Sequence, residues 1–222
     1  MSFSSTSSGA VISGTASEVG ANTTSNFTIR AKDAASNVSD RAFSILKEAP
    51  TVQTFTSSGT FSVPSGVSTV QVLVVAGGGS GGASIGGGGG AGGLVYHAGY
   101  PVTPGGTLTV TVGCGGGASP CNCAGNAGSD TTFGSPGDPG LNPGGLVLTA
   151  KGGGRGGKST GTPNNAQPGG SGGGGGGHGD NQAGGTAIQP TQPGNSGAYG
   201  FGNPGGNSNP GTSPRNSGGG GG

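Results

Sequence analysis

The chain has 222 residues with 60 glycines and 15 prolines, and only 7% of its residues are charged, for a formal net charge of +1. Nucleic acid is not an expected partner, because phosphate binding needs clustered Lys and Arg and the eight basic residues here are scattered. No stretch approaches the roughly 20 apolar residues of a membrane span, so we expect no membrane insertion. The opening residues MSFSSTSSGA lack the basic and apolar regions of a signal peptide. We therefore expect either that this route of secretion is not used or that the chain is a fragment.

Glycine divides the chain into two parts. Only five glycines precede residue 76, namely Gly9, Gly14, Gly20, Gly59 and Gly66. No stretch of useful length has the 3.6-residue periodicity of an amphipathic helix, whereas several short stretches alternate apolar and polar residues. The sequence therefore predicts an all-β fold followed by, and interleaved with, a glycine-rich region.

Residues 1–48 are expected to form β structure. Residues 26–31 and 41–46 alternate with period two, residues 12–20 predict a short strand and a turn, and residues 32–40 predict a turn-rich connector. This is too little chain to bury a core of its own. Asp33, Asn37 and Asp40 in the connector are candidate calcium ligands, but the favoured interpretation is turn chemistry, in which Asp and Asn bond their own backbone.

The same residues carry a resemblance. The stretch GAVISGTASEVGANTTSNFTIRAKDAASNVSDRAFSIL resembles the C-terminal part of bacterial and phage immunoglobulin-like repeats, where the pattern closes a β-sandwich. The resemblance implies a partial immunoglobulin-like β repeat over 1–48, followed by a linker at 49–53. The opening strands of such a sandwich are missing, so we expect that the chain is a fragment or that another chain completes the sheet.

Residues 54–150 are expected to form a β and glycine-rich domain. The stretch 54–76 predicts three strands separated by the turn residues SSG and PSG, with Phe55, Phe61 and Val63 on one apolar face. The continuous apolar run 70–75 predicts a buried strand. Further strands are expected at 94–97, 107–112 and 146–150, and Leu108, Val110 and Val112 alternate onto one face.

Three interpretations of the glycine tracts compete. A flexible linker suits residues 202–222 but not 76–157, where strand-forming segments keep returning. A phosphate-binding loop is disfavoured because that motif opens a helix inside a βαβ unit. The third interpretation is a bundle of polyproline-II (polyglycine II) helices, which have three residues per turn and can bond to one another where side chains are absent. Runs such as 86–90, 172–177 and 218–222 suit such helices, and residues 151–222 are expected to be polyproline-II-like or partly flexible.

The glycine-rich part of the chain also shows a resemblance to a known family. The order FTSSGTFSVPSGVSTVQVLVVAGGGSGG, then GGGGGAGGLVYH, then TPGGTLTVTVGCGG resembles the glycine-rich domain of bacteriophage tail fibres and tail-tip adhesins, particularly those of marine cyanophages. It covers 55–150 specifically and 150–222 more loosely. In that family a short apolar strand commonly follows the last glycine run, so we expect the chain, which stops at GGGGG, to be incomplete there. The resemblance implies a virion protein, released by host lysis, and a symmetric homo-oligomer such as a homotrimer.

Isolated aromatic and charged residues among the glycines are the candidates for receptor binding, because aromatic faces stack on sugars and apolar surfaces. They are Tyr96, His97, Tyr100, Arg155, Lys158, His178, Asp180, Tyr199 and Phe201. For Tyr96 and Tyr100 the alternative is that they cap the small core, whereas for Tyr199 and Phe201 exposed contact is favoured.

Catalysis is not expected. His178 with Asp180 is the most enzyme-like pair, but a polar loop is the favoured interpretation, and no nucleophile elbow follows a strand into a helix. Three cysteines allow one disulfide, Cys114 with Cys121 or Cys123, and no His lies near to complete a metal site. No cofactor and no metal are expected.

The leading functional hypothesis is a phage fibre or tail adhesin that binds a bacterial surface glycan or outer-membrane protein and contacts other virion proteins. The alternatives are a purely structural virion component, such as a capsid decoration or connecting fibre, and a non-viral extracellular glycine-rich filament protein.

Overall fold

The computed structural model describes residues 2–6, 9–14, 21–119, 123–142, 145–159, 166–177, 182–189, 198–209 and 218–222. These residues form strands, turns and extended segments, and the expected all-β class is confirmed for them. They contain no helix of the length and apolarity that a membrane span requires. The chain divides into two compact units, Met1–Thr54 and Phe55–Gly222. The domain boundary expected at residue 150 is therefore not a boundary between compact units, because residues 55–222 form one unit.

The first unit consists of two antiparallel hairpins. One pairs β1 (Ser2–Thr6) with β2 (Gly9–Ser13), and the other pairs β3 (Thr23–Lys32) with β4 (Val38–Lys47). The strands expected at 26–31 and 41–46 are confirmed and lie inside β3 and β4. The predicted strand at 12–20 overlaps only the end of β2, and residues 15–20 lie outside the described residues.

Turn chemistry closes the β3–β4 hairpin. The Asp33 carboxylate accepts hydrogen bonds from the Asn37 amide at 2.8 Å and from Asn37 Nδ2 at 2.7 Å, which lowers the pKa of Asp33. Ser36 takes a left-handed φ of 70° in the same turn. Asp40 accepts two hydrogen bonds, each 2.7 Å long, from Arg30. The bonds of Asp33 support the turn interpretation of Asp33 and Asn37, whereas Asp40 lies in β4 and forms a cross-strand ion pair with Arg30, so the turn interpretation is wrong for Asp40.

Apolar side chains of the first unit remain open to solvent. Phe27 stacks on Phe43 with ring centroids 5.7 Å apart, yet Phe43 is 40% exposed and Leu46 is 57% exposed. A two-stranded sheet offers no second layer to cover such residues, and an isolated hairpin is marginally stable in water. The expectation that this stretch cannot bury a core of its own is confirmed for the described side chains.

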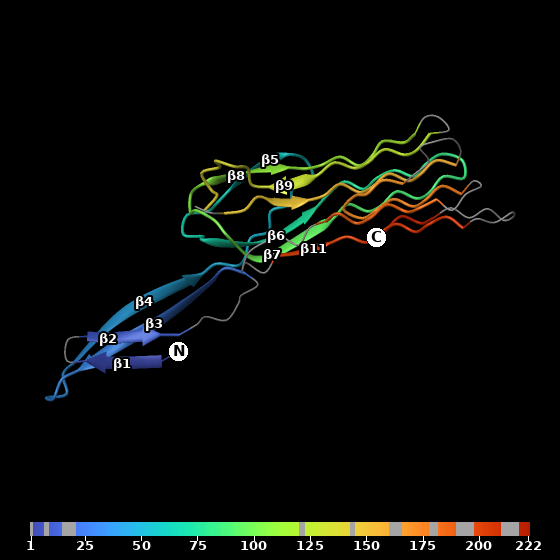
Figure 1. Cartoon of the computed structure of the whole chain (residues 1–222). Helices are drawn as coiled ribbons and strands as arrows, with labels where there is room; N and C mark the ends of the chain where they lie inside the picture. The colour runs from blue at the N-terminus through green and yellow to red at the C-terminus, as the bar shows by residue number, and fades with distance from the viewer. Residues whose placement is uncertain are drawn as a thin grey trace. The chain divides into compact units, whose positions relative to one another are not determined.

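The second unit is built on two antiparallel sheets. The four-stranded sheet has the order β10 (Leu148–Ala150), β9 (Thr131–Phe133), β8 (Thr107–Thr111), β5 (Gly59–Ser62). The three-stranded sheet has the order β11 (Ala198–Phe201), β7 (Leu94–Pro101), β6 (Thr69–Val75). Figure 1 shows both sheets at one end of this unit, with extended glycine-rich segments running side by side away from them.

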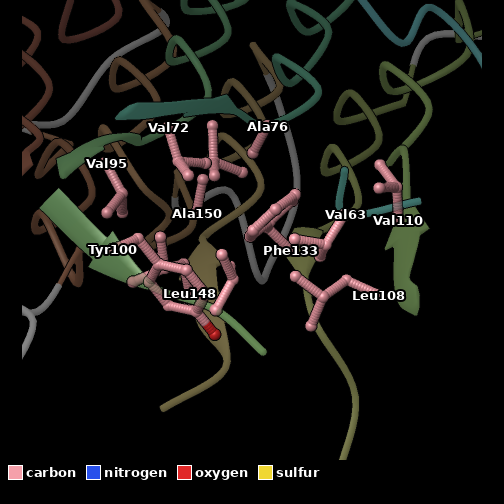
Figure 2. Close-up of a cluster of buried hydrophobic side chains, with 12 residues drawn as sticks. Val63, Val72, Ala76, Val95, Tyr100, Leu108, Val110, Phe133, Leu148 and Ala150 are labelled. Carbon is pink, nitrogen blue, oxygen red and sulfur yellow. The ribbon is translucent and has the colours of Figure 1, made fainter. Parts of the chain in front are cut away.

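The apolar core lies between the two sheets. Its buried side chains come from both and gather in one interior (Figure 2): Val63, Val72, Val74, Ala76, Val95, Tyr100, Val102, Leu108, Val110, Phe133, Leu148 and Ala150. The face predicted from Leu108, Val110 and Val112 is confirmed, since the first two are buried and Val112 packs against the cluster. The ring of Phe133 lies 5.4 Å from that of Tyr100 and 5.7 Å from that of Phe61.

The apolar run of β6 is buried on one face only, which corrects the expectation of a fully buried strand. Val72 and Val74 point into the core, whereas Leu73 is 62% exposed and Val75 is 53% exposed. The reason is that the three-stranded sheet has a second layer on one side only, so alternate residues of β6 meet solvent.

The glycine-rich stretches form extended segments that hydrogen-bond to one another through their backbones. The segments are 76–82, 86–93, 113–118, 124–130, 151–158, 169–177, 182–187, 202–208 and 218–222. Their bonds recur at every third residue: the amides of Ala76, Gly79 and Gly82 donate to the carbonyls of Gly93, Gly90 and Gly87. The next amides along, those of Gly77, Ser80 and Ala83, donate to Ser129, Asn126 and Cys123 of a different segment. Each segment is thereby bonded to several neighbours in different directions.

Segment 151–158 lies inside this bundle. It donates to segments 76–82 and 169–177 and accepts from segments 86–93 and 124–130, in each case at three-residue intervals. A Cβ built on Gly79 would lie 2.2 Å from the Gly154 carbonyl oxygen, and one on Gly87 would lie 1.9 Å from that of Gly174. Neighbouring backbones therefore approach more closely than any side chain allows at these positions.

We expect Gly79→Ala to destabilise the second unit by about 1–3 kcal/mol, the usual cost of forcing a group into a filled space. Gly78→Ala is the matched control, because its Cβ would be 3.5 Å from the nearest atom, the Gly90 oxygen. The free energy of unfolding in guanidinium checks the pair. Equal stability of the two variants would contradict the packing described here.

Tyr100 should make the stability of this unit sensitive to high pH. Burial, with the nearby Asp138 charge, raises the pKa of Tyr100 from 10.0 to about 12, and its hydroxyl donates to the Leu146 carbonyl at 2.8 Å. Its stabilising contribution is fully present below pH 10.0 and is lost as pH rises through about 12. In the wild type this alkaline loss of stability should be roughly 2 kcal/mol. It should be smaller in Tyr100→Phe, which has no hydroxyl to ionise at this position. Unfolding curves at neutral and alkaline pH test this, and an equal alkaline loss in the wild type and Tyr100→Phe would contradict the role assigned to this hydroxyl.

Candidate functional site

One end of the glycine bundle collects the segment ends that lie away from the sheets. The Ala83 amide bonds to the Cys123 carbonyl at 2.9 Å, the Gly177 amide to the Ile85 carbonyl at 2.7 Å, and the Gly87 amide to the Gly157 carbonyl at 2.8 Å. Since 76–82 begins at the end of β6, these residues lie at the far end of the bundle. We call this region the distal end.

A tight turn at the distal end presents a serine. The Gly82 amide donates to the Gly87 carbonyl at 2.9 Å and closes the connection between two antiparallel segments. Ser84, within this connection, is exposed and has a left-handed φ of 63°. Its side chain is therefore available at the distal surface.

Arg155 and Lys158 lie three residues apart on segment 151–158. Together with Cys123, Ala124, Gly125 and Asn126 they line a shallow pocket of about 370 Å³. Nε of Arg155 is buried and has no hydrogen-bond partner among the described residues. Neither cation takes part in an ion pair within the described part of the chain.

A carboxylate fixes the start of the same segment. Asp130 accepts a hydrogen bond from Lys151 Nζ at 2.7 Å and one from the Gly152 amide at 2.8 Å. Desolvation opposes the charge of Asp130, but these bonds and the Lys151 charge outweigh it, so the pKa of Asp130 is lowered. Asp130 thus ties the end of segment 124–130 to the beginning of 151–158.

Two of the aromatic candidates belong to the core. His97 is 2% exposed and Tyr100 is 1% exposed, with their rings 5.3 Å apart edge to face. Burial lowers the pKa of His97, and its Nδ1 accepts a hydrogen bond from the Gly99 amide at 3.2 Å. In this structure neither ring is available to a receptor. The binding expectation is therefore wrong for His97, and for Tyr100 the alternative of a role in the core agrees with the structure.

A β-bulge explains why both rings point inward. Val70 pairs with Tyr100 and Val72 pairs with His97. The partners are thus two residues apart on β6 but three residues apart on β7. Residues three apart on a regular strand face opposite sides, but the extra residue of a bulge restores the same side. Tyr96 therefore remains on the outer face, where it is half-buried.

The outer face of the three-stranded sheet carries apolar residues in two cross-strand rows. Leu73 pairs with Tyr96, and Val75 pairs with Leu94, which pairs with Phe201. The backbone of Tyr199 pairs with that of Tyr96. Phe201 is 56% exposed, which agrees with the expectation of exposed contact at this residue. Leu73 and Val75 were not expected at the surface, although their alternation with Val72 and Val74 is visible in the sequence.

Only some of the remaining candidates lie among the described residues. Cys114 is a free, exposed thiol and Cys123 is disulfide-bonded, so the pairing of Cys114 that the spacing left open is not formed. Cys121, His178, Asp180 and the side chain of Tyr199 lie outside the described part of the chain. Among the described residues no group of three His, Cys, Asp or Glu side chains could hold a metal ion.

Comparison with known proteins identifies the second unit. The model of a family described as a glycine-rich domain matches residues 54–222. The chain belongs to this glycine-rich domain family. No curated protein and no solved structure matches it significantly. The family match begins within one residue of the boundary at Thr54 and includes every glycine segment, so the bundle and the two sheets together are the glycine-rich domain.

Asp130→Asn should loosen the start of segment 151–158 and lower the stability of the glycine-rich domain by about 1 kcal/mol at neutral pH. Because the folded pKa of Asp130 is lowered from 3.8, its contribution is present above that value and is lost as pH falls through the folded pKa. Wild type and variant should therefore converge in acid. Asp40→Asn is the matched control, since the Asp40 side chain, which forms an ion pair in the first unit, is 42% exposed against 43% for Asp130. Urea unfolding of the domain measures both, and a pH-independent difference would contradict the assignment.

Proposed function

We propose that this chain is part of a phage virion fibre or tail adhesin that binds the bacterial surface without catalysis. The observation that carries the proposal is the distal end, where the ends of several glycine segments are hydrogen-bonded to one another beside the exposed turn at Ser84. Such an arrangement holds the turn at Ser84 on a hydrogen-bonded scaffold and suits recognition, since binding residues concentrate on loops positioned by a scaffold. The resemblance of residues 55–150 to tail-fibre domains points the same way.

We infer that the glycine segments are polyproline-II-like helices. The support is the three-residue recurrence of their hydrogen bonds, because polyproline II has three residues per turn and no internal hydrogen bonds. A chain of this kind directs successive amides to three sides, which agrees with the several neighbours of segment 151–158.

We propose that the first unit is the end of an immunoglobulin-like repeat and that it is completed by further strands. The support is its sequence pattern and the exposed apolar side chains of its two-stranded sheet, among them Phe43, Ile45 and Leu46. We also propose that the chain forms a homo-oligomer, with a trimer as the proposed state, because fibres are usually symmetric oligomers. Other virion proteins are its proposed partners.

The candidate contacts with a surface glycan or outer-membrane protein are Arg155 and Lys158 near the distal end and Tyr96 and Phe201 on the outer sheet face. Tyr199, His178 and Asp180 remain candidates from the sequence. The purely structural alternatives, a capsid decoration or connecting fibre, or a non-viral filament, need no such contacts.

Immunogold electron microscopy of the source particles, with antibody against residues 151–222, tests the location. We expect label at tail tips or fibre ends, abolished when the antibody is pre-absorbed with the purified chain. Label over the capsid would replace the adhesin with a decoration protein. Label on free filaments without particles would overturn the viral assignment.

Competition for adsorption tests the role of the distal end. Purified chain added to host cells should reduce adsorption of the particles, and Ser84→Arg should weaken this competition at least fivefold by obstructing the distal surface. Ser65→Arg is the matched control, because Ser65 is also exposed, in the turn closed by the Val67 amide to the Pro64 carbonyl, at the end away from the bundle. Equal competition by both variants would exclude the distal end as the binding surface.

A further inference from the structure

The pocket beside segment 124–130 has the features of an anion site. Arg155 and Lys158 are both on the segment that lies inside the bundle, and the three-residue repeat brings positions 155 and 158 to the same side. A Cβ on Gly152, one repeat earlier, would lie 2.1 Å from the Gly128 carbonyl oxygen, so this side of the segment faces segment 124–130. The two cations therefore converge beside residues 123–126, which complete the pocket.

These two cations differ from the other described charged residues of the glycine-rich domain, which are paired or hydrogen-bonded. Lys151 is paired with Asp130, and Asp138 is held by the Thr109 amide and hydroxyl and by the Ser135 amide. Arg155 and Lys158 have no carboxylate partner among the described residues. They form a local cluster of two positive charges in a chain whose net charge is only +1.

The buried Nε of Arg155 is a hydrogen-bond donor that has no acceptor among the described residues. A buried donor without an acceptor is destabilising, and Arg Nε together with one terminal nitrogen matches the two oxygens of a carboxylate or phosphate. Hydrogen bonds of this charge-assisted kind are among the stronger ones in proteins. An oxyanion in the pocket would neutralise both cations at once, and rotation of the guanidinium toward it would give Nε an acceptor.

We propose that Arg155 and Lys158 form a subsite for an oxyanion group, phosphate or carboxylate, carried by an acidic glycan of the bacterial surface. This inference rests on the proposed function for the source of the ligand, but the subsite itself does not. Arg155 binds the oxyanion through Nε and its guanidinium fork, and Lys158 supplies the second positive charge near the distal opening. Residues 123–126 form the wall and set the depth to which a sugar ring enters.

Titration of the ¹⁵N-labelled chain tests the subsite directly. The probes are inorganic phosphate, glucose 1-phosphate and glucuronate, with glucose as the neutral control. We expect saturable shifts of the Arg155 Nε–H signal and of the amides of 123–126 with the anions and none with glucose. A response to glucose 1-phosphate but not to glucuronate assigns the ligand as a sugar phosphate, and the reverse assigns it as a uronate.

Variants separate specific binding from general attraction of anions. Arg155→Gln and Lys158→Gln should each weaken binding at least roughly tenfold, and Arg155→Lys should weaken it because the fork is lost while the charge is kept. Lys32→Gln, which removes an exposed cation from the first unit, is the matched control and should bind as the wild type does. If Arg155→Gln fails to fold, Lys158→Gln and the wild-type Nε signal still decide the question.

The outcomes distinguish the two proposals. Shifts that do not saturate, or that are equal in Lys158→Gln and Lys32→Gln, would overturn the subsite and indicate an adventitious ion only. Host-cell binding that survives Arg155→Gln and Lys158→Gln would overturn the role of the subsite in recognition and leave the adhesin proposal standing. Saturable anion binding by a chain that does not bind host cells would overturn the adhesin proposal and leave the subsite standing.

Discussion

The structure of the glycine-rich domain depends on one constraint, the approach of backbones to distances at which no Cβ fits. Glycine loses more conformational freedom on folding than any other residue, so ordering these segments is costly. Each backbone hydrogen bond contributes only about 0.5–1.5 kcal/mol net, so the cost can be offset only where bonds are dense. The bonds of segment 151–158 to four neighbouring segments meet this condition, and a segment standing alone would not. The bundle is therefore stable only as a whole.

The same constraint decides where chemistry can appear. Positions such as Gly79 and Gly87 exclude side chains, so functional groups are confined to turns, to outward positions and to the sheets. Ser84 occupies a turn, and Arg155 and Lys158 occupy the side of an interior segment that faces the pocket. In a domain with so few side chains, a charged residue that has no partner among the described residues has few structural roles left, which is why the two cations stand out more than they would on an ordinary surface.

Much of the β architecture could be predicted, because alternation reports burial directly. Leu108 and Val110 point inward as their spacing indicates, and the returning apolar stretches correctly argued against a linker. The short strands β9 and β11 were not predicted, since three or four residues carry no period and their pairing is decided by long-range contacts. The burial of His97 was not predicted, and that of Tyr100 was left as one of two alternatives, because a bulge that the residue types do not reveal changes which side of β7 they face. For the pocket, the sequence indicated Arg155 and Lys158 but not the wall at 123–126, which comes from a segment about thirty residues earlier in the chain.

The sheets also define the hydrogen-bond register of the glycine segments, which glycine alone does not specify. A run of identical residues has no side-chain pattern to define which amide bonds to which carbonyl, so alternative registers of the bundle would differ little in local energy. Here the segments begin where strands end: β6 leads into 76–82, and β10 leads into 151–158, whose start is further held by Asp130. A slip of one residue in 151–158 would bring Arg155 to a place where Gly154 or Gly156 now stands, with a Cβ about 2 Å from a carbonyl oxygen. The apolar core and the few non-glycine residues thus specify the register, and the glycines specify the spacing.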